Sequence, residues 1–242
     1  MSGEGMVGGM RERIIVALDL PEADQAVVTA AGLEGRVSRV KVGLTLFSAS
    51  GPAIVERLQA RGLGVFLDLK FHDIPHQVAG ACRRMVALGV DMFTVHASGG
   101  RAMLRSAVEA TRDAAGESGV AKPSVLAVTV LTSMDTVGMR ETGVDRPAEE
   151  QVLTLAALAA SEEVDGVVCS PREADRVRGL LGEEALVVTP GVRPAWAQMD
   201  DQVRVSTPQE ALEQGASHVV IGRPITAAPD PVEALERIIR GA

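Results

Sequence analysis

The sequence of 242 residues is short of aromatic side chains, with four Phe, one Trp and no Tyr. Proteins that hold single-stranded nucleic acid stack the bases on aromatic rings, so such a binding platform is not expected. Basic residues are in the minority, because 24 Lys and Arg stand against 32 Asp and Glu. The net charge of −8 makes the protein poorly suited to coating DNA or an anionic membrane, and neither partner is expected.

Cysteines and long apolar runs are also scarce. Cys82 and Cys169 lie in apolar surroundings without CxxC spacing, which favours core thiols in a reducing compartment. No apolar run approaches the ~20 residues that a membrane span needs. The Gly-rich start, MSGEGMVGGM, lacks the apolar region of a signal peptide. We therefore expect a flexible tail over residues 1–10 and a cytoplasmic protein.

Short runs rich in Val, Ile and Leu alternate with longer segments of helical spacing. Eight runs predict strands: 13–20, 37–44, 64–71, 90–97, 124–131, 164–170, 185–191 and 217–223. Eight segments predict helices: 22–34, 48–62, 75–88, 100–116, 148–162, 171–181, 207–215 and 230–240. In the seventh helix, Thr207-Pro208 with Glu210 has the pattern of a capping box.

Alternating strands and helices predict a parallel sheet covered by helices. Eight units in this length predict an α/β fold with a single domain, a (β/α)8 TIM barrel over residues 11–242. An open doubly wound sheet is the alternative. Its dinucleotide signature, GxGxxG after the first strand, is missing, because Asp19-Leu20-Pro21 stands there.

Ionisable side chains gather where the predicted strands end, which is where barrel enzymes build their active sites. Asp19 and Lys41 end the first two strands, and the third reads FLDLKFHDIP, with Asp68, Lys70 and Asp73. Side chains alternate along a strand, so Asp68 and Lys70 share one face and should point into the barrel mouth. Flanking carboxylates favour the ammonium form of a lysine, which then donates protons and stabilises negative charge. A solvated ion pair at a strand tip is the plain alternative, and Lys41 keeps Schiff-base chemistry open.

The last two strands end in a pattern typical of phosphate binding. Gly222 and Arg223 follow the eighth strand, where backbone N–H groups and a guanidinium could hold an oxyanion. The polar segment after the seventh strand, 193–204, could close over a phosphate. Trp196 in that segment is expected to be a packing anchor. His96 ends the fourth strand and could line the pocket or belong to the core, and no HxH or HExxH spacing suggests zinc.

These pieces together resemble the orotidine 5′-phosphate decarboxylases in their bacterial form, from VALDL at 16–20 to IGRPIT at 221–226. The motifs that carry the resemblance are KVGL, the DxKxxD pattern of FLDLKFHDIP, TVLTSM, TPGVRP, the DDQ before Arg204, and VVIGRPI. The resemblance implies decarboxylation of orotidine 5′-monophosphate to UMP and CO2, the last step of de novo pyrimidine synthesis, without cofactor or metal.

The resemblance also implies residue roles. Lys70 protonates C6 of the pyrimidine, Asp68 lies beside the departing carboxylate, and Lys41 completes the alternating charges. Asp73 reaches across a homodimer interface into the neighbouring site. The other substrate contacts implied are Asp19 and Lys41 at the ribose, Ile74 and Gln77 beside Asp73, Thr132 in the loop over the base, and Arg193, Gln202, Gly222 and Arg223 at the phosphate.

One departure and two rival functions stay open. Many relatives continue DIP with Asn-Thr, whereas this chain has His76-Gln77, so a contact made by the threonine would fall to Gln77. Metal-dependent enzymes of phosphorylated keto-sugars share DxKxxD but carry an acidic residue where Lys41 stands. A non-catalytic nucleotide sensor on the same barrel would keep Arg223 without needing the DxKxxD residues.

Overall fold

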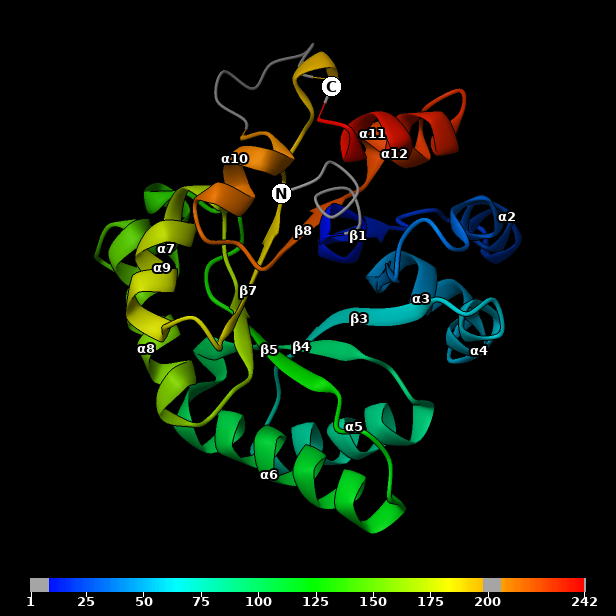
Figure 1. Cartoon of the computed structure of the whole chain (residues 1–242). Coiled ribbons are helices and arrows are strands. Elements are labelled where there is room, and N and C mark those ends of the chain that lie inside the picture. The colour runs from blue at the N-terminus through cyan, green and yellow to red at the C-terminus, as the bar shows by residue number, and fades with distance from the viewer. Residues whose placement is uncertain (1–8, 198–205, 242) are drawn as a thin grey trace.

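A computed structural model of the chain describes residues 9–197 and 206–241. Its centre is a parallel sheet of eight strands that closes into a barrel in sequence order (Figure 1). The strands are β1 (Ile14–Ala17), β2 (Arg39–Gly43), β3 (Gly64–Phe71), β4 (Met92–His96), β5 (Ser124–Val128), β6 (Gly166–Val168), β7 (Leu186–Pro190) and β8 (His218–Ile221). Each lies within its predicted range, which confirms the (β/α)8 barrel.

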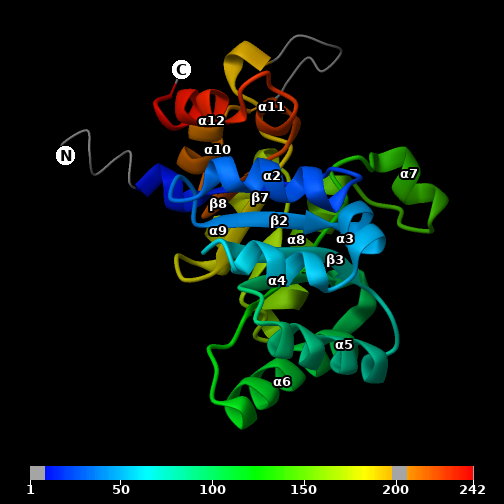
Figure 2. The ribbon, with the colours of Figure 1, turned by 90° about the vertical axis from the view of Figure 1, so that its right-hand side faces the viewer.

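Helices surround the barrel, as the two perpendicular views show (Figures 1 and 2). They are α2 (Ala23–Leu33), α3 (Leu44–Ser50), α4 (Ala53–Gln59), α5 (Pro75–Leu88), α6 (Gly100–Ser118), α7 (Thr136–Glu141), α8 (Ala148–Ser161), α9 (Ala174–Leu181), α10 (Pro208–Glu213), α11 (Arg223–Thr226) and α12 (Pro231–Ile239). Three single turns of 3-10 helix accompany them at Ala97–Gly99, Pro171–Glu173 and Ala195–Ala197. Every strand therefore leads back to the next one through at least one helix.

The prediction of one helix over 48–62 is wrong, because that segment contains the end of α3 and, after a break, the separate helix α4. Gly51 has φ 60° and ends α3, and Pro52 is the N-cap of α4. A proline disfavours helical backbone at the residue before it, so a helix cannot run smoothly through this pair. Two further helices, α7 and α11, were not predicted, since six and four residues are too few to show a helical period.

Helix ends follow the local signals in the sequence. The Thr207 hydroxyl accepts a hydrogen bond from the backbone N–H of Glu210, and the Glu210 carboxylate accepts one from the N–H of Thr207. This reciprocal pair is the predicted capping box at the start of α10. Gly89, with φ 68°, ends α5 in the left-handed conformation that a residue without Cβ adopts readily.

The core has two layers separated by the sheet. Inward side chains of alternate strand positions fill the barrel, among them Ile15, Phe66, Met92 and Leu126. The opposite faces of the same strands pack against the helices in a larger cluster that includes Phe93. Aliphatic side chains dominate both layers, as the shortage of aromatic residues predicts. The inner layer packs directly beneath the strand ends that carry the site.

The terminal and cysteine predictions have different outcomes. Residues 1–8 of the predicted tail lie outside the described part, and residues 9–13 are helical, with Met10 packed against the outer core. Both cysteines are buried free thiols, as predicted, and burial raises the pKa of Cys82 and of Cys169 to about 12. Among the described helices, none combines the length and apolar character needed to cross a membrane.

Candidate active site

Four charged side chains meet at the carboxyl ends of neighbouring strands, and we call them the charge array. Asp19 follows β1, Lys41 lies in β2, and Asp68 and Lys70 lie in β3. Lys41 Nζ is 2.9 Å from Asp19 Oδ1 and 3.6 Å from Asp68 Oδ2. Lys70 Nζ donates to the other oxygen of that carboxylate, Asp68 Oδ1, over 2.8 Å. The charges therefore alternate in sign along a continuous chain of contacts.

The charge array runs from solvent into the barrel mouth. The side chain of Asp19 is 59% exposed, whereas that of Asp68 is 14% exposed and that of Lys41 is 10% exposed. A buried ammonium is costly unless anions surround it, and Lys41 has carboxylates on two sides. The Lys70 side chain keeps 28% of its surface exposed. Its ammonium is thus held by a carboxylate on a side chain that stays partly exposed.

The Asp68 carboxyl has a lowered pKa despite its burial. Desolvation acts to raise that pKa, and it is the largest single influence. The opposing influences are the positive charges of Lys41 and Lys70 and the hydrogen bonds that Lys70 and Thr94 donate. Together they outweigh desolvation and keep Asp68 ionised, so that the charge array holds an anion between the two lysine ammonium groups.

Two residues of this region were not singled out from the sequence. Thr94, fully buried in β4, donates its hydroxyl to Asp68 Oδ1 over 2.9 Å and accepts the Lys70 backbone N–H over 2.9 Å. A Cβ on Gly43 would lie 2.9 Å from Asp19 Oδ1 and 3.0 Å from Lys41 Nζ. Only their positions in the sequence could have indicated them, because Thr94 is a polar inward residue of an apolar strand and Gly43 stands two residues after Lys41.

Asp73, which is expected at a subunit interface, and its predicted neighbours in the site, Ile74 and Gln77, follow the charge array along the chain. Asp73, Ile74 and Gln77 are all exposed in the single chain, Ile74 to 62%. Asp73 Oδ1 accepts the backbone N–H of Ile74 over 2.6 Å. These side chains follow β3 and open α5, so their place at the carboxyl end of the barrel agrees with the predicted strand ends.

His72 and His96 form a second feature beside Lys70. Their ring centroids are 5.4 Å apart, with the rings inclined at 41°. Burial is the main cause that lowers the pKa of His96, and the positive charges of His72 and Lys70 lower it further. His96 is half-buried at the end of β4, close enough to the charge array for Asp68 to act in the opposite direction.

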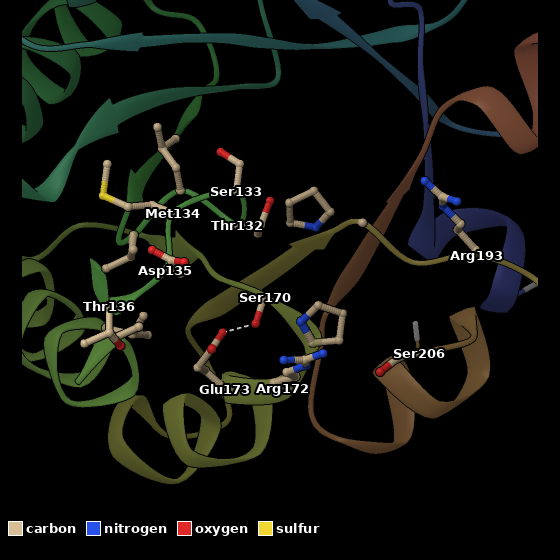
Figure 3. Close-up of a pocket in the computed structure, with 17 residues that line it drawn as sticks. Thr132, Ser133, Met134, Asp135, Thr136, Ser170, Arg172, Glu173, Arg193 and Ser206 are labelled. Carbon is tan, nitrogen blue, oxygen red and sulfur yellow. Dashed lines mark hydrogen bonds between the residues drawn. The ribbon is translucent and has the colours of Figure 1, made fainter. Parts of the chain in front are cut away.

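A cavity of about 860 Å³ opens at the same, carboxyl end of the barrel as the charge array. It is lined by the segments that follow β5, β6 and β7, and Figure 3 shows Thr132 and Arg193 at different sides of it. Ser170 and Glu173 hydrogen bond to each other in its wall. The charge array and Arg223 do not belong to its lining. The cavity therefore joins two of the predicted contacts, at the base loop and at the phosphate end.

The predicted phosphate residues lie at the ends of β7 and β8. The N–H of Arg193 donates to the carbonyl of Ser206 over 3.1 Å, which ties together the two ends of the intervening segment. Gln202 falls in that segment and lies outside the described residues. Gly222 precedes α11, and a Cβ there would be 3.9 Å from Asp19 Oδ2. This short distance shows that the ends of β8 and β1 are neighbours at the site. Arg223 is exposed at the start of α11.

The fold and the site define a (β/α)8-barrel protein with an alternating lysine–carboxylate array at the carboxyl ends of its strands. Residues 12–238 match the model of the family described as "Orotidine 5'-phosphate decarboxylase / HUMPS family". The chain belongs to this family, as its motifs predict.

Individual relatives agree with the family match. The chain is 52% identical over 229 residues to a protein of Moorella thermoacetica named "Orotidine 5'-phosphate decarboxylase", covering 94% of this chain and 91% of that one. It is 49% identical over 225 residues to the Paramagnetospirillum magneticum protein of the same name, covering 93% and 96%. A crystal structure of orotidine 5'-phosphate decarboxylase from Lactobacillus acidophilus superposes with a TM-score of 0.82 at 40% identity, covering 96% of this chain and all of that one.

Proposed function

We propose that this chain decarboxylates orotidine 5′-monophosphate to UMP and CO2, the last step of de novo pyrimidine synthesis. The observation that carries the proposal is the contact of Lys70 Nζ with Asp68, 2.8 Å long, within an array that Lys41 extends to Asp19. Relatives about half identical over nearly the whole chain bear the name of this activity, which supports the same substrate here.

In the proposed reaction the bond between C6 and the carboxylate carbon breaks, and CO2 leaves. The electron pair stays at C6 in the plane of the ring, where the π-system cannot readily accept it. The Lys70 ammonium stabilises this pair electrostatically and then gives C6 a proton, which yields UMP and a neutral amine. Solvent returns a proton to the amine. Lysine is suited to this step because its contact with Asp68 places the ammonium before the substrate reacts.

Asp68 and Lys41 act on the reacting groups by charge. A substrate carboxylate ~4 Å from Asp68 would be repelled by about 4 kcal/mol at an effective dielectric constant near 20. The repulsion ends when CO2 leaves, whereas the attraction of Lys70 for the carbanion grows, and we assign the larger part of catalysis to that attraction. Lys41 holds Asp68 ionised and, with Asp19, contacts the ribose. The proposed reaction requires neither a cofactor nor a metal.

The remaining predicted residues belong to binding in this proposal. Thr132 contacts the base, and Arg193, Gln202, Gly222 and Arg223 hold the phosphate, whose binding energy closes the loops over the reacting centre. Asp73 reaches the site of a second copy in a homodimer, which its exposure in the single chain supports, and Ile74 and Gln77 contact the substrate. We place the enzyme in the cytoplasm, with residues 11–242 as one catalytic domain after a tail.

The test is the loss of orotidine 5′-monophosphate absorbance on mixing with enzyme. Lys70→Ala should lower kcat by 1000-fold or more while UMP still binds, because the change removes the proton donor and the main electrostatic stabiliser, each worth orders of magnitude. Lys122→Ala is the matched control. It removes another lysine that contacts a carboxylate, at 2.6 Å from Asp165, but at the opposite ends of the strands. Its kcat should stay at the wild-type value.

The family name also covers a second group of enzymes, so the metal-dependent rival needs its own arm of the test. Wild-type activity should persist in EDTA, and phosphorylated keto-sugars should not be consumed. Activity abolished by EDTA, or wild-type protein that never releases CO2 from orotidine 5′-monophosphate, would reject the proposed function. UMP bound by a wild type that never turns over would favour the nucleotide sensor.

A further inference from the structure

The backbone of Lys70 departs from a regular strand at the residue that the proposed reaction needs most. Lys70 has φ 55°, and Glu163 is the other non-glycine residue with positive φ among the described residues. The pairing of β3 with β4 shifts between Leu67 and Phe71, so the ladder is interrupted at Lys70. Such a conformation persists only where the surroundings hold it in place.

Thr94 is the group that holds it. The Lys70 N–H donates to Thr94 Oγ1 over 2.9 Å. The same hydroxyl donates its single proton to Asp68 Oδ1 over 2.9 Å. One oxygen therefore fixes the main chain of the lysine and the side chain of its carboxylate partner at once. Because a hydroxyl has one proton, its donation to Asp68 leaves its lone pair free to accept the amide.

The surroundings of Thr94 make this bridge rigid. Thr94 is fully buried, and β-branching restricts its χ1 rotation. Asp68 Oδ1 accepts from both Thr94 and Lys70 Nζ, while Asp68 Oδ2 faces Lys41. Without the Thr94 hydroxyl, the Lys70 amide would lose its hydrogen-bond partner and the carboxylate could rotate toward either lysine.

We propose that Thr94 is a positioning residue, whose hydroxyl fixes the Lys70 ammonium and the Asp68 carboxylate in the geometry required for proton transfer to C6. This inference rests on the proposed function but concerns a residue whose hydroxyl bonds to the Lys70 main chain and the Asp68 carboxylate rather than to the Lys70 ammonium. It separates two properties of the site. The substrate is bound chiefly through its ribose and phosphate, whereas Thr94 affects only how the acid and the carboxylate lie.

The kinetic test compares Thr94→Val, which keeps the shape and removes the hydroxyl, with Thr94→Ser, which keeps the hydroxyl. A displacement of about 1 Å can cost roughly 100-fold in rate, so Thr94→Val should lower kcat by about 10- to 100-fold with KM within about threefold. Thr94→Ser should recover kcat to within about threefold of wild type, since the bridge can re-form. Thr111→Val is the control, because it removes another fully buried hydroxyl, bonded to the Ala107 carbonyl in α6.

Two results would overturn the inference. A Thr94→Val enzyme with wild-type kcat would show that the bridge does not matter for the rate. A Thr94→Ser enzyme as slow as Thr94→Val would assign the loss to packing rather than to the hydroxyl. Thr111→Val should keep wild-type kcat, and an equal loss there would mean that any buried hydroxyl has this effect.

A measurement on the wild-type protein covers the case in which Thr94→Val does not fold. Native-state amide exchange should show the Lys70 N–H protected although it lies at a break in the ladder, and rapid exchange there would also reject the bridge. The proposed function fails separately. Wild type that leaves orotidine 5′-monophosphate unchanged while its Lys70 amide is protected would reject the reaction and keep the structural bridge.

Discussion

Gly43 provides a test of the charge array that leaves every charged residue in place. An alanine Cβ there would lie 2.9 Å from Asp19 Oδ1 and 3.0 Å from Lys41 Nζ. Ordinary contacts of a Cβ are 3.4–4 Å, so both polar ends must retreat by about half an ångström. The Gly43 backbone, with φ −97° and ψ −177°, is open to alanine, and both clashing atoms end flexible side chains.

Gly43→Ala should therefore fold and lose activity. The methyl group enters the space beside the ion pair between Asp19 and Lys41, which is 2.9 Å long in the wild type. The displaced Lys41 ammonium also changes its distance to Asp68, which is 3.6 Å in the wild type. A catalytic group misplaced by about 1 Å can lower the rate roughly 100-fold, so we expect kcat/KM to fall by about 10- to 100-fold. The melting temperature should fall by several degrees, because Gly43 is buried and an extra methyl group in a packed site costs about 1–3 kcal/mol, with about 2–4 °C lost per kcal/mol in a domain of this size.

The assay is decarboxylation followed by absorbance, alongside thermal unfolding of the same preparation. Gly116→Ala is the control, because its added Cβ meets open space on the exposed side of α6. Alanine is the better helix former, so this control should gain about 0.5–1 kcal/mol of stability at unchanged kcat/KM. Wild-type kcat/KM in Gly43→Ala would refute the view that the Asp19–Lys41 geometry matters, and an unfolded variant would assign the glycine to folding instead.

Two further predictions concern charge. Lys41→Gln removes a cation that lowers the pKa of Asp68, so that pKa should rise and the acidic limb of the kcat/KM profile should move to higher pH; an unmoved limb would contradict the assignment. Burial, helped by two neighbouring arginines, lowers the pKa of His218 to about 4, so the unfolded state binds the extra proton between pH 4 and pH 6.5 and acid destabilises the fold there. The free energy of unfolding, measured in urea, should fall by about 3 kcal/mol less in His218→Gln than in wild type between pH 7 and pH 4. The control is His76→Gln, at an exposed position, whose free energy of unfolding should change with pH as that of wild type does.

Much of the fold could be read from the sequence because its signals are local. Each strand is a short apolar run between helical segments, and all eight lie within their predicted ranges. The capping box at Thr207 depends on residues three apart and was likewise predictable. The predicted helix over 48–62 failed where one proline and one positive φ outweighed the apolar spacing. Period alone also cannot reveal helices as short as α7 and α11.

The site was predictable to the extent that it follows strand order. Asp19, Lys41, Asp68 and Lys70 end three consecutive strands, and a closed parallel barrel must bring such ends together. Their partners were not predictable, because they depend on register between strands. Thr94 lies opposite the break in the ladder between β3 and β4, and Gly43 pairs with Asp68 across β2 and β3. Neither relation is visible within a single strand.

The backbone of Lys70 shows why that register matters for chemistry. A left-handed conformation costs a residue other than glycine about 1–2 kcal/mol, and a hydrogen bond returns about 0.5–1.5 kcal/mol. The bond from the Lys70 N–H to Thr94 can thus offset much of the cost, and the contact of Lys70 Nζ with Asp68 adds to it. The lysine is consequently held in a conformation that a free chain would rarely adopt. No reorganisation of this residue is then required as charge develops on the substrate, and that is the condition under which an electrostatic site accelerates a reaction.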